Sequence, residues 1–89
     1  MRVTVHYLAQ VRRAVGRAEE IFDTAADGTL ADLIQFLATE HPAAASMLLE
    51  ADGRPSRSLL FFVNDGPFDL DAVLPNPAVV TVLAPMAGG

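Results

Sequence analysis

The C-terminal residues contain the one group in this sequence that we expect to do chemistry. An apolar run from Val79 to Leu83 is followed by Pro85 and small residues, and the sequence ends in Gly88 and Gly89. Since about 7% of residues are glycine, two glycines at a given place occur by chance roughly once in 200 chains, and the pair alone is weak evidence. The order of predicted strand, proline and bare diglycine indicates that the reactive group is the terminal carboxylate of Gly89.

The composition excludes most side-chain chemistry and several kinds of partner. There is no cysteine and there are only two histidines, so the sequence predicts no thiolate nucleophile, disulfide or multi-histidine metal site. A net charge of -5 argues against nucleic acid, whose phosphates would repel the protein. The apolar runs are too short for a bilayer, and no signal-peptide pattern follows Met1, so we expect a cytoplasmic protein without a membrane partner.

Two strands and a basic connector are predicted in the N-terminal part. Residues 3–8 alternate, which places Val3, Val5 and Tyr7 on one face and His6 on a solvated face. Residues 19–23 give a short second strand, hairpinned to the first.

The connector at residues 9–17 is expected to be a loop or a single helical turn, with Gly16 marking a turn. Arg12, Arg13 and Arg17 make a local basic spot there. We prefer a solvated connector to a partner-binding loop, because charged side chains usually face water.

The main helix is predicted from Thr29 to Glu40. Thr29 is a favourable N-cap, and Asp32 stands where the acid of a capping box belongs. Pro42 ends the helix, and His41 in its last turn is explained by the helix dipole without a catalytic role. The residues of the helix at i, i+3, i+4, i+7 and i+8 form one apolar stripe that we assign to the core: Leu30, Leu33, Ile34, Leu37 and Ala38.

After a short second helix within residues 43–50, the C-terminal half is predicted to return to strands. The continuous apolar run at 58–63 is expected near the middle of the sheet and covered by the helix, and residues 68–70 are expected to form a brief strand. Because Pro75 and Pro77 cannot donate to a ladder, pairing should resume only at residue 78.

The last strand, residues 78–83, supplies the candidate docking surface. With Val80 and Val82 facing the core, the intervening residues face outward and form an exposed apolar surface for a partner. These are Val79, Thr81 and Leu83.

This order of elements favours an α+β fold in which a helix lies across one face of a mixed sheet. With the two terminal strands parallel at the centre, the fold is a β-grasp with four to five strands, one main helix and a short second helix. We assign residues 1–83 to this domain and residues 84–89 to a flexible diglycine tail.

Several motifs, taken in order, resemble those of a known family. An Ala-x-x-Arg-x-x-x-Gly segment is matched by Ala9, by Arg12 or Arg13, and by Gly16. An apolar strand ends in Val63-Asn64, and residues 80–89 read Val-Thr-Val-Leu-Ala-Pro-Met-Ala-Gly-Gly. Across nearly the whole chain the sequence is similar to the ubiquitin-like β-grasp sulfur carriers, most closely the small subunit of molybdopterin synthase.

Two positions depart from that family and leave the pathway open. Asn76-Pro77-Ala78 replaces the usual Gly-Asp-Glu turn before the last strand, and Ala84 replaces the first proline of a Pro-Pro pair. Neither touches the terminus, so sulfur carriage is still expected. The resemblance extends to carriers that supply sulfur for cysteine or secondary metabolites, and then to thiamine-pathway carriers, which usually lack a segment like 42–56.

The resemblance implies a chemistry in which Gly89 is the substrate of other enzymes. An adenylating, E1-like partner uses ATP and Mg²⁺ to convert the carboxylate to an acyl-adenylate, and a sulfur donor displaces AMP to leave a thiocarboxylate. A second enzyme, such as the large subunit of molybdopterin synthase or another sulfur-using synthase, accepts the sulfur. The chain itself is expected to bind no cofactor or metal and to be no enzyme alone; it supplies positioning.

The tail residues suit threading into a partner's active site. Six extended residues from Ala84 to Gly89 reach on the order of 20 Å, at about 3.3–3.6 Å each. The glycines lack a Cβ atom and pass a narrow channel, Pro85 stiffens the start of the tail, and Met86 adapts to apolar walls. We assign threading to Pro85, Met86, Ala87 and Gly88, and packing at the channel mouth to Leu83.

Two other classes of function compete with the carrier. A ubiquitin-like modifier would join Gly89 to lysines of target proteins, and an interaction domain would have an inert tail. All six basic residues are arginine, so the chain cannot build isopeptide chains of itself, which favours the carrier.

Overall fold

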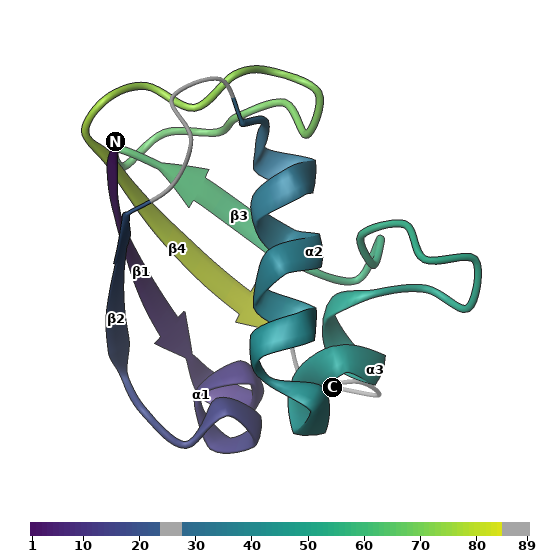
Figure 1. Cartoon of the computed structure of the whole chain (residues 1–89). Helices are drawn as coiled ribbons and strands as arrows, with labels where there is room; N and C mark the ends of the chain where they lie inside the picture. Colours follow the sequence, from purple (N-terminus) through teal and green to yellow (C-terminus); the bar gives the residue numbers. More distant parts are fainter. Residues whose placement is uncertain (24–27, 85–89) are drawn as a thin grey trace.

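A four-stranded sheet with helix α2 across one face organises the structure, a computed structural model that describes residues 1–23 and 28–84 (Figure 1). In this part of the chain no helix is long and apolar enough to cross a membrane. The elements in chain order are β1 (Arg2–Leu8), α1 (Ala9–Val15), β2 (Glu19–Asp23), α2 (Leu30–Glu40), a 3-10 helix (Pro42–Ala44), α3 (Ala45–Leu48), β3 (Leu60–Val63) and β4 (Ala78–Ala84).

The strands at the two ends of the sequence, β1 and β4, pair in parallel at the centre of the sheet. β2 pairs antiparallel with β1, and β3 pairs antiparallel with β4, so the strand order is β2-β1-β4-β3. This confirms the predicted β-grasp, with α2 as the main helix and α3 as the short second one. The inward residues of the central strands are fully buried, and a register slip of one residue would expose them. They are Val3, Val5, Tyr7, Val80 and Val82.

Helix α2 begins and ends where its sequence predicts. The Asp32 amide donates to the Thr29 hydroxyl oxygen at 3.1 Å, and the Thr29 amide donates to the Asp32 carboxylate at 3.1 Å, which completes the capping box. The helix ends at Glu40, before Pro42. The predicted apolar stripe is buried against the sheet. Each large side chain buried this way contributes about 1.5–3 kcal/mol relative to its exposed state.

The segment at residues 68–70 is not a strand, contrary to the prediction. It runs past the start of α2, where the Ala31 amide donates to the Leu70 carbonyl at 2.9 Å and the Leu30 amide donates to the Ala72 carbonyl at 3.2 Å. The first amides of a helix have no acceptor within it. The segment therefore satisfies the N-terminus of α2 in place of joining the sheet.

Strand β3 lies at the edge of the sheet, so its predicted place near the middle is wrong. The strand begins at Leu60, not at residue 58. It pairs only with β4, whose other side pairs with β1. Leu60 and Phe62 are 47% and 39% exposed. The apolar run therefore does not indicate burial on both faces, because the face of the strand that carries Leu60 and Phe62 is exposed to solvent.

Helix α1 and strand β4 are longer than predicted. Residues 9–15 form a complete short helix, α1, whose Val11 is buried, where a loop or a single turn was expected. It ends at Gly16, whose φ of 89° is left-handed and whose amide donates to the Arg12 carbonyl at 2.8 Å; glycine adopts this conformation at no steric cost. Strand β4 includes the buried Ala84, which the sequence had placed at the start of the tail.

Candidate functional site

The outer face of the sheet, opposite α2, carries the residues that were predicted to dock a partner. Residues paired across neighbouring strands share a face, and β4 pairs Val79 with Thr4 and Thr81 with His6. Val79 is 39% exposed, while Thr81 and Leu83 are partly exposed. The outward orientation of these three residues is as predicted; that they dock a partner stays a prediction.

Leu83 is the centre of an apolar cluster on this face. It is paired with Leu8 of β1 on one side and with Leu60 of β3 on the other, and these are 43% and 47% exposed. Large apolar residues that gather at one place on a surface mark interaction sites more often than single ones do. We call the following set the outer apolar cluster: Leu8, Leu60, Phe62, Val79 and Leu83.

Sequence reasoning missed three members of the outer apolar cluster. Leu8 could have been found, because alternation in β1 puts it on the same face as His6. Leu60 and Phe62 were missed because their strand was expected near the middle of the sheet and covered by the helix, and their continuous apolar run has no alternation that marks an outer side.

Strand β4 ends beside the start of α1. Ala84 forms an isolated parallel bridge with Ala9, the first residue of α1. The proposed reactive residue Gly89 and the threading residues Pro85, Met86, Ala87 and Gly88 lie outside the described residues. The site that the structure shows is therefore the base of the tail: the end of β4, the outer apolar cluster and α1.

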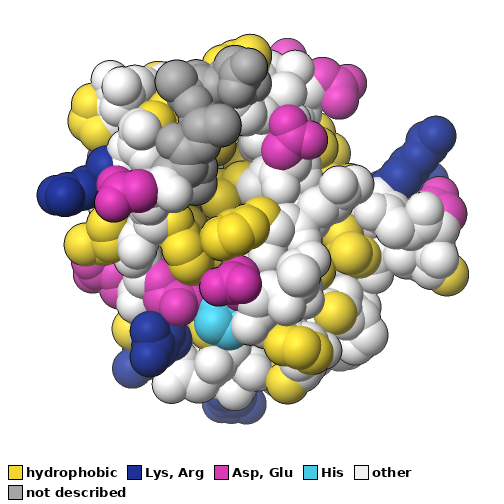
Figure 2. Space-filling model, viewed as in Figure 1, with side chains coloured by type: hydrophobic (Ala, Val, Ile, Leu, Met, Phe, Trp, Pro, Cys, Tyr) yellow, Lys and Arg dark blue, Asp and Glu magenta, His cyan; other side chains and the backbone are white. Residues whose placement is uncertain are grey.

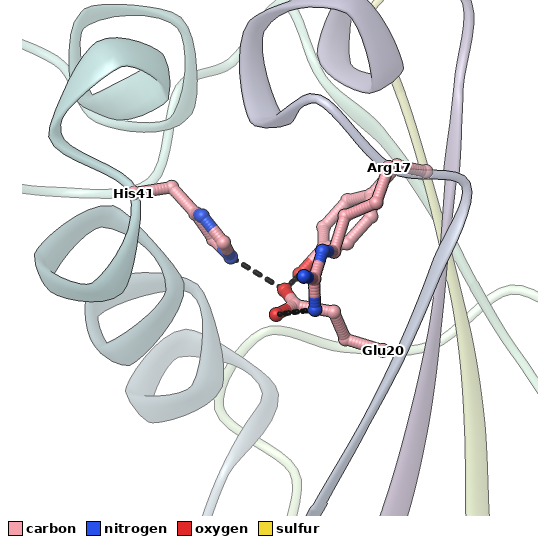
Figure 3. Close-up of polar contacts among 4 residues, drawn as sticks. Arg17, Glu20 and His41 are labelled. Atoms are coloured by element: carbon pink, nitrogen blue, oxygen red, sulfur yellow. Dashed lines mark hydrogen bonds and ion pairs between the residues drawn. The ribbon is translucent and has the colours of Figure 1, made fainter.

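A cluster of polar side chains that sequence reasoning did not predict lies on the inner side of the sheet, where Glu20 of β2 is the common acceptor (Figure 3). The Tyr7 hydroxyl donates to Glu20 Oε1 at 2.7 Å, and His41 Nε2 lies 2.5 Å from the same atom. Arg17 Nη1 donates to Glu20 Oε2 at 3.2 Å. The Tyr7 ring also meets the His41 ring edge to face, with centroids 5.9 Å apart.

These contacts set the protonation of the cluster. Burial alone would raise the pKa of Glu20, but hydrogen bonds from Tyr7 and His41 and the charge of Arg17 outweigh it and lower the pKa below its ordinary value. Burial and the neighbouring Glu20 raise the pKa of Tyr7 far above its usual range. An ionised Glu20 is an acceptor only, so Tyr7 and His41 both donate to it.

The geometry gives the cluster a structural role. The side chains of Glu20 and His41 are 13% and 16% exposed, and Tyr7 is fully buried, so a substrate has little access to them. The contacts join β1, β2 and the C-terminal end of α2. His41 is therefore held by a hydrogen bond to Glu20, a contact that the sequence prediction of a helix-dipole role did not include. Alternation in β2 puts Glu20 on the inner face with Phe22, which was the signal available in the sequence.

Two surface grooves lie among the residues that the structure describes. One, of about 470 Å³, is lined by residues of α1 and the turn after it. The other, of about 720 Å³, lies between α2 and the loop around residues 50–57, and mixed charges line it, among them Glu50, Asp52, Arg54 and Arg57. In residues 1–23 and 28–84 no group of three or more His, Cys, Asp or Glu side chains could hold a metal ion.

The strand order and the helix across one face define the class of protein, a ubiquitin-like β-grasp. SAMP1 from Haloferax volcanii superposes on the chain with a TM-score of 0.91 at 20% identity, over 100% of both chains. The putative molybdopterin converting factor, subunit 1, from Pyrococcus furiosus gives 0.77 at 23% identity, over 97% of this chain and 99% of that one. A chain from the complex of subunits 1 and 2 of molybdopterin-converting factor from Helicobacter pylori 26695 gives 0.63 at 21% identity, over 100% of both.

The sequence then gives the family. The model of the ThiS family matches residues 5–89, which include Gly88 and Gly89, so the chain belongs to the ThiS family of ubiquitin-like sulfur carriers. No curated protein matches the sequence. Family and fold together define a small sulfur carrier or a ubiquitin-like modifier.

Proposed function

We propose that this chain is a sulfur carrier that is activated at the carboxylate of Gly89. The observation that supports it most is the ThiS family match, which runs through the diglycine. Strand β4 adds a physical reason, because the central parallel pair with β1 holds the base of the tail rigidly at one end of the sheet. A rigid base limits the directions in which the reactive end can be presented, and so raises its effective concentration in a partner's site.

The proposed chemistry has two steps on Gly89, both catalysed by a partner. A carboxylate oxygen attacks the α-phosphorus of ATP, with Mg²⁺ bound by the partner, and pyrophosphate leaves. A sulfur nucleophile at the oxidation level of sulfide then attacks the acyl carbon, AMP leaves, and a thiocarboxylate remains. In this scheme the chain catalyses nothing alone, and its side chains supply docking.

We further propose molybdopterin synthesis as the destination of the sulfur. The similarity to the molybdopterin converting factor of P. furiosus supports this pathway, and the H. pylori structure is a complex of two such subunits. By analogy, a larger sulfur-accepting subunit would cover the outer apolar cluster. Carriers for cysteine, secondary-metabolite or thiamine sulfur use the same terminal chemistry and differ in the accepting enzyme.

A protein modifier is the second candidate, and one observation favours it. SAMP1 from H. volcanii is similar to this chain over its whole length. A second similar H. volcanii structure carries the name small archaeal modifier protein 1, which identifies SAMP1 as a modifier protein. A modifier would use the same activation and pass Gly89 to a lysine of a target. The lack of lysine in the chain excludes self-linked chains but not single attachments.

Intact mass of the protein isolated from its native host, with sulfur metabolism active, separates these functions. We expect a species that is heavier by the difference between one sulfur and one oxygen atom, and a variant without Gly89 should lack it. Adducts of Gly89 with other proteins, without the heavier species, would replace the carrier by the modifier. Deletion of the gene should abolish molybdenum-enzyme activity, whereas a cysteine or thiamine requirement would move the sulfur to another pathway.

A further inference from the structure

The groove beside α1 is strongly basic on a protein that is acidic as a whole. Its lining contains no acidic residue, although the chain has a net charge of -5. Three of the six arginines of the chain line it. In Figure 2, dark blue side chains lie at the lower end of the molecule, the end that α1 occupies in Figure 1. The lining residues are Ala9, Arg12, Arg13, Gly16, Arg17 and Ala18.

Two of these arginines have no acidic partner in the part of the chain that the structure describes. Arg12 and Arg13 are exposed and form no ion pair there, whereas Arg17 donates to Glu20. The dipole of α1 favours cations near its last turn, by about 0.3–1 kcal/mol each. That effect accounts for Arg12 and Arg13 as helix residues, and the ion pair with Glu20 accounts for the position of Arg17. Arg12 and Arg13 are therefore the two cations of the groove that no acidic side chain of the described residues neutralises.

The groove lies at the base of the tail. Ala9, which lines it, is bridged to Ala84, the last residue of β4. If residues 85–89 are threaded into a partner in extended form, they span about 17 Å at about 3.3–3.6 Å each. The nucleotide that reacts with Gly89 would then be too far from Arg12 and Arg13 to contact them. The arginines would instead face the protein surface around the mouth of the partner's channel.

We propose that this groove binds carboxylate side chains of the activating partner at the mouth of its channel. The occupant is an acidic protein segment, because the flat guanidinium groups of Arg12 and Arg13 can each hold a carboxylate through two hydrogen bonds. The groove thus orients the domain about the tail while the outer apolar cluster supplies contact area. The identity of the partner in this inference rests on the proposed function. The binding of carboxylates by the groove does not depend on it.

A titration of the labelled full-length protein with hexaglutamate, followed by backbone amide NMR, tests the binding itself. We expect saturable shifts confined to residues 9–18 and lost in high salt, with none from an uncharged Gly-Ser hexapeptide. The variant R12Q/R13Q should bind about fivefold more weakly, as two exposed ion pairs predict. The matched variant R54Q/R57Q removes two arginines from the other groove, so its net charge equals that of R12Q/R13Q. Because its groove beside α1 is intact, it should bind hexaglutamate as tightly as the wild type does.

Each other outcome of this titration overturns the proposal. Equal weakening in both double variants would show a general effect of net charge. Saturable binding of inorganic triphosphate in the groove, without binding of hexaglutamate, would make it a phosphate site.

The second measurement is the initial rate of thiocarboxylate formation in native-host lysate with ATP and sulfide, by intact mass. R12Q/R13Q should lower the rate about fivefold at low carrier concentration, because it loses the same two ion pairs with the partner. At high carrier concentration its rate should approach that of the wild type. R54Q/R57Q should match the wild type throughout, and equal rates for all three proteins would contradict the proposal. If the wild type forms no thiocarboxylate, the proposed function fails while the NMR result still stands.

Discussion

The hydroxyl of Tyr7 and the carboxylate of Glu20 are joined by a hydrogen bond of 2.7 Å at the inner edge of the sheet. Tyr7 lies on β1, whose other side pairs with β4, the strand that carries the tail. The same carboxylate contacts His41, the residue after the end of α2, so Glu20 joins the end of the helix to the central strand β1. The cluster therefore holds the base of the tail indirectly, from the side of the sheet that faces away from the outer apolar cluster.

Acid should weaken this link. The pKa of Glu20 is lowered on folding from its ordinary value of 4.5, so its contribution to stability is present above about that pH and is lost as the pH falls through the folded-state pKa. We expect the free energy of unfolding to fall more steeply below pH 4.5 in the wild type than in Glu20→Gln. Urea denaturation at a series of pH values measures this slope.

At neutral pH the same variant should be less stable by about 1–3 kcal/mol, because it loses charge-assisted hydrogen bonds. Glu19→Gln is the control, since Glu19 is the neighbouring residue on the outer face, with a half-exposed side chain. Identical acid limbs for the wild type and Glu20→Gln would show that the cluster does not contribute to the pH dependence.

The central strands and the main helix could be predicted because each has one buried face with its own period. Alternation fixed the inward side of β1 and β4, and a stripe with helical period fixed the inward side of α2. β3 could not be placed, because an unbroken apolar run has no period and its neighbours depend on which edge of β4 is free. The Glu20 cluster needs contacts between residues up to 34 apart in sequence, Tyr7 to His41, which local patterns do not reveal.

Removal of the α2 cap should cost a measurable part of the stability. Thr29→Ala loses the hydrogen bond from the Asp32 amide, and loss of such a cap costs about 1 kcal/mol. For a domain of this size the melting temperature should fall by about 4–8 °C. Thr39→Ala, an exposed threonine of the same helix, should change it little. Equal effects of the two substitutions in thermal denaturation would show that the capping box is not what stabilises this end of α2.

The outer apolar cluster should matter for activation more than for stability. Leu83→Ala removes its central side chain, and an interface anchor of this kind contributes about 1–2 kcal/mol to binding. A loss of binding free energy in this range corresponds to an affinity that is about tenfold weaker. We therefore expect the initial rate of thiocarboxylate formation in native-host lysate to fall about tenfold at low carrier concentration. The control Val73→Ala removes an apolar side chain that is 54% exposed and lies outside the outer apolar cluster. If both variants form thiocarboxylate at the wild-type rate, the cluster is not the docking surface.

One residue added after Gly89 gives the sharpest test of the terminal mechanism. An alanine there moves the carboxylate by about 3.3–3.6 Å along an extended chain, beyond the position that a fitted active site would attack. It also places a Cβ atom where Gly88 and Gly89 have none. We expect thiocarboxylate formation to be lost, with an unchanged melting temperature. The same alanine added before Met1 is the matched control and should leave both unchanged. An extended protein that still acquires sulfur at the wild-type rate would show that the reactive group is not the carboxylate of Gly89.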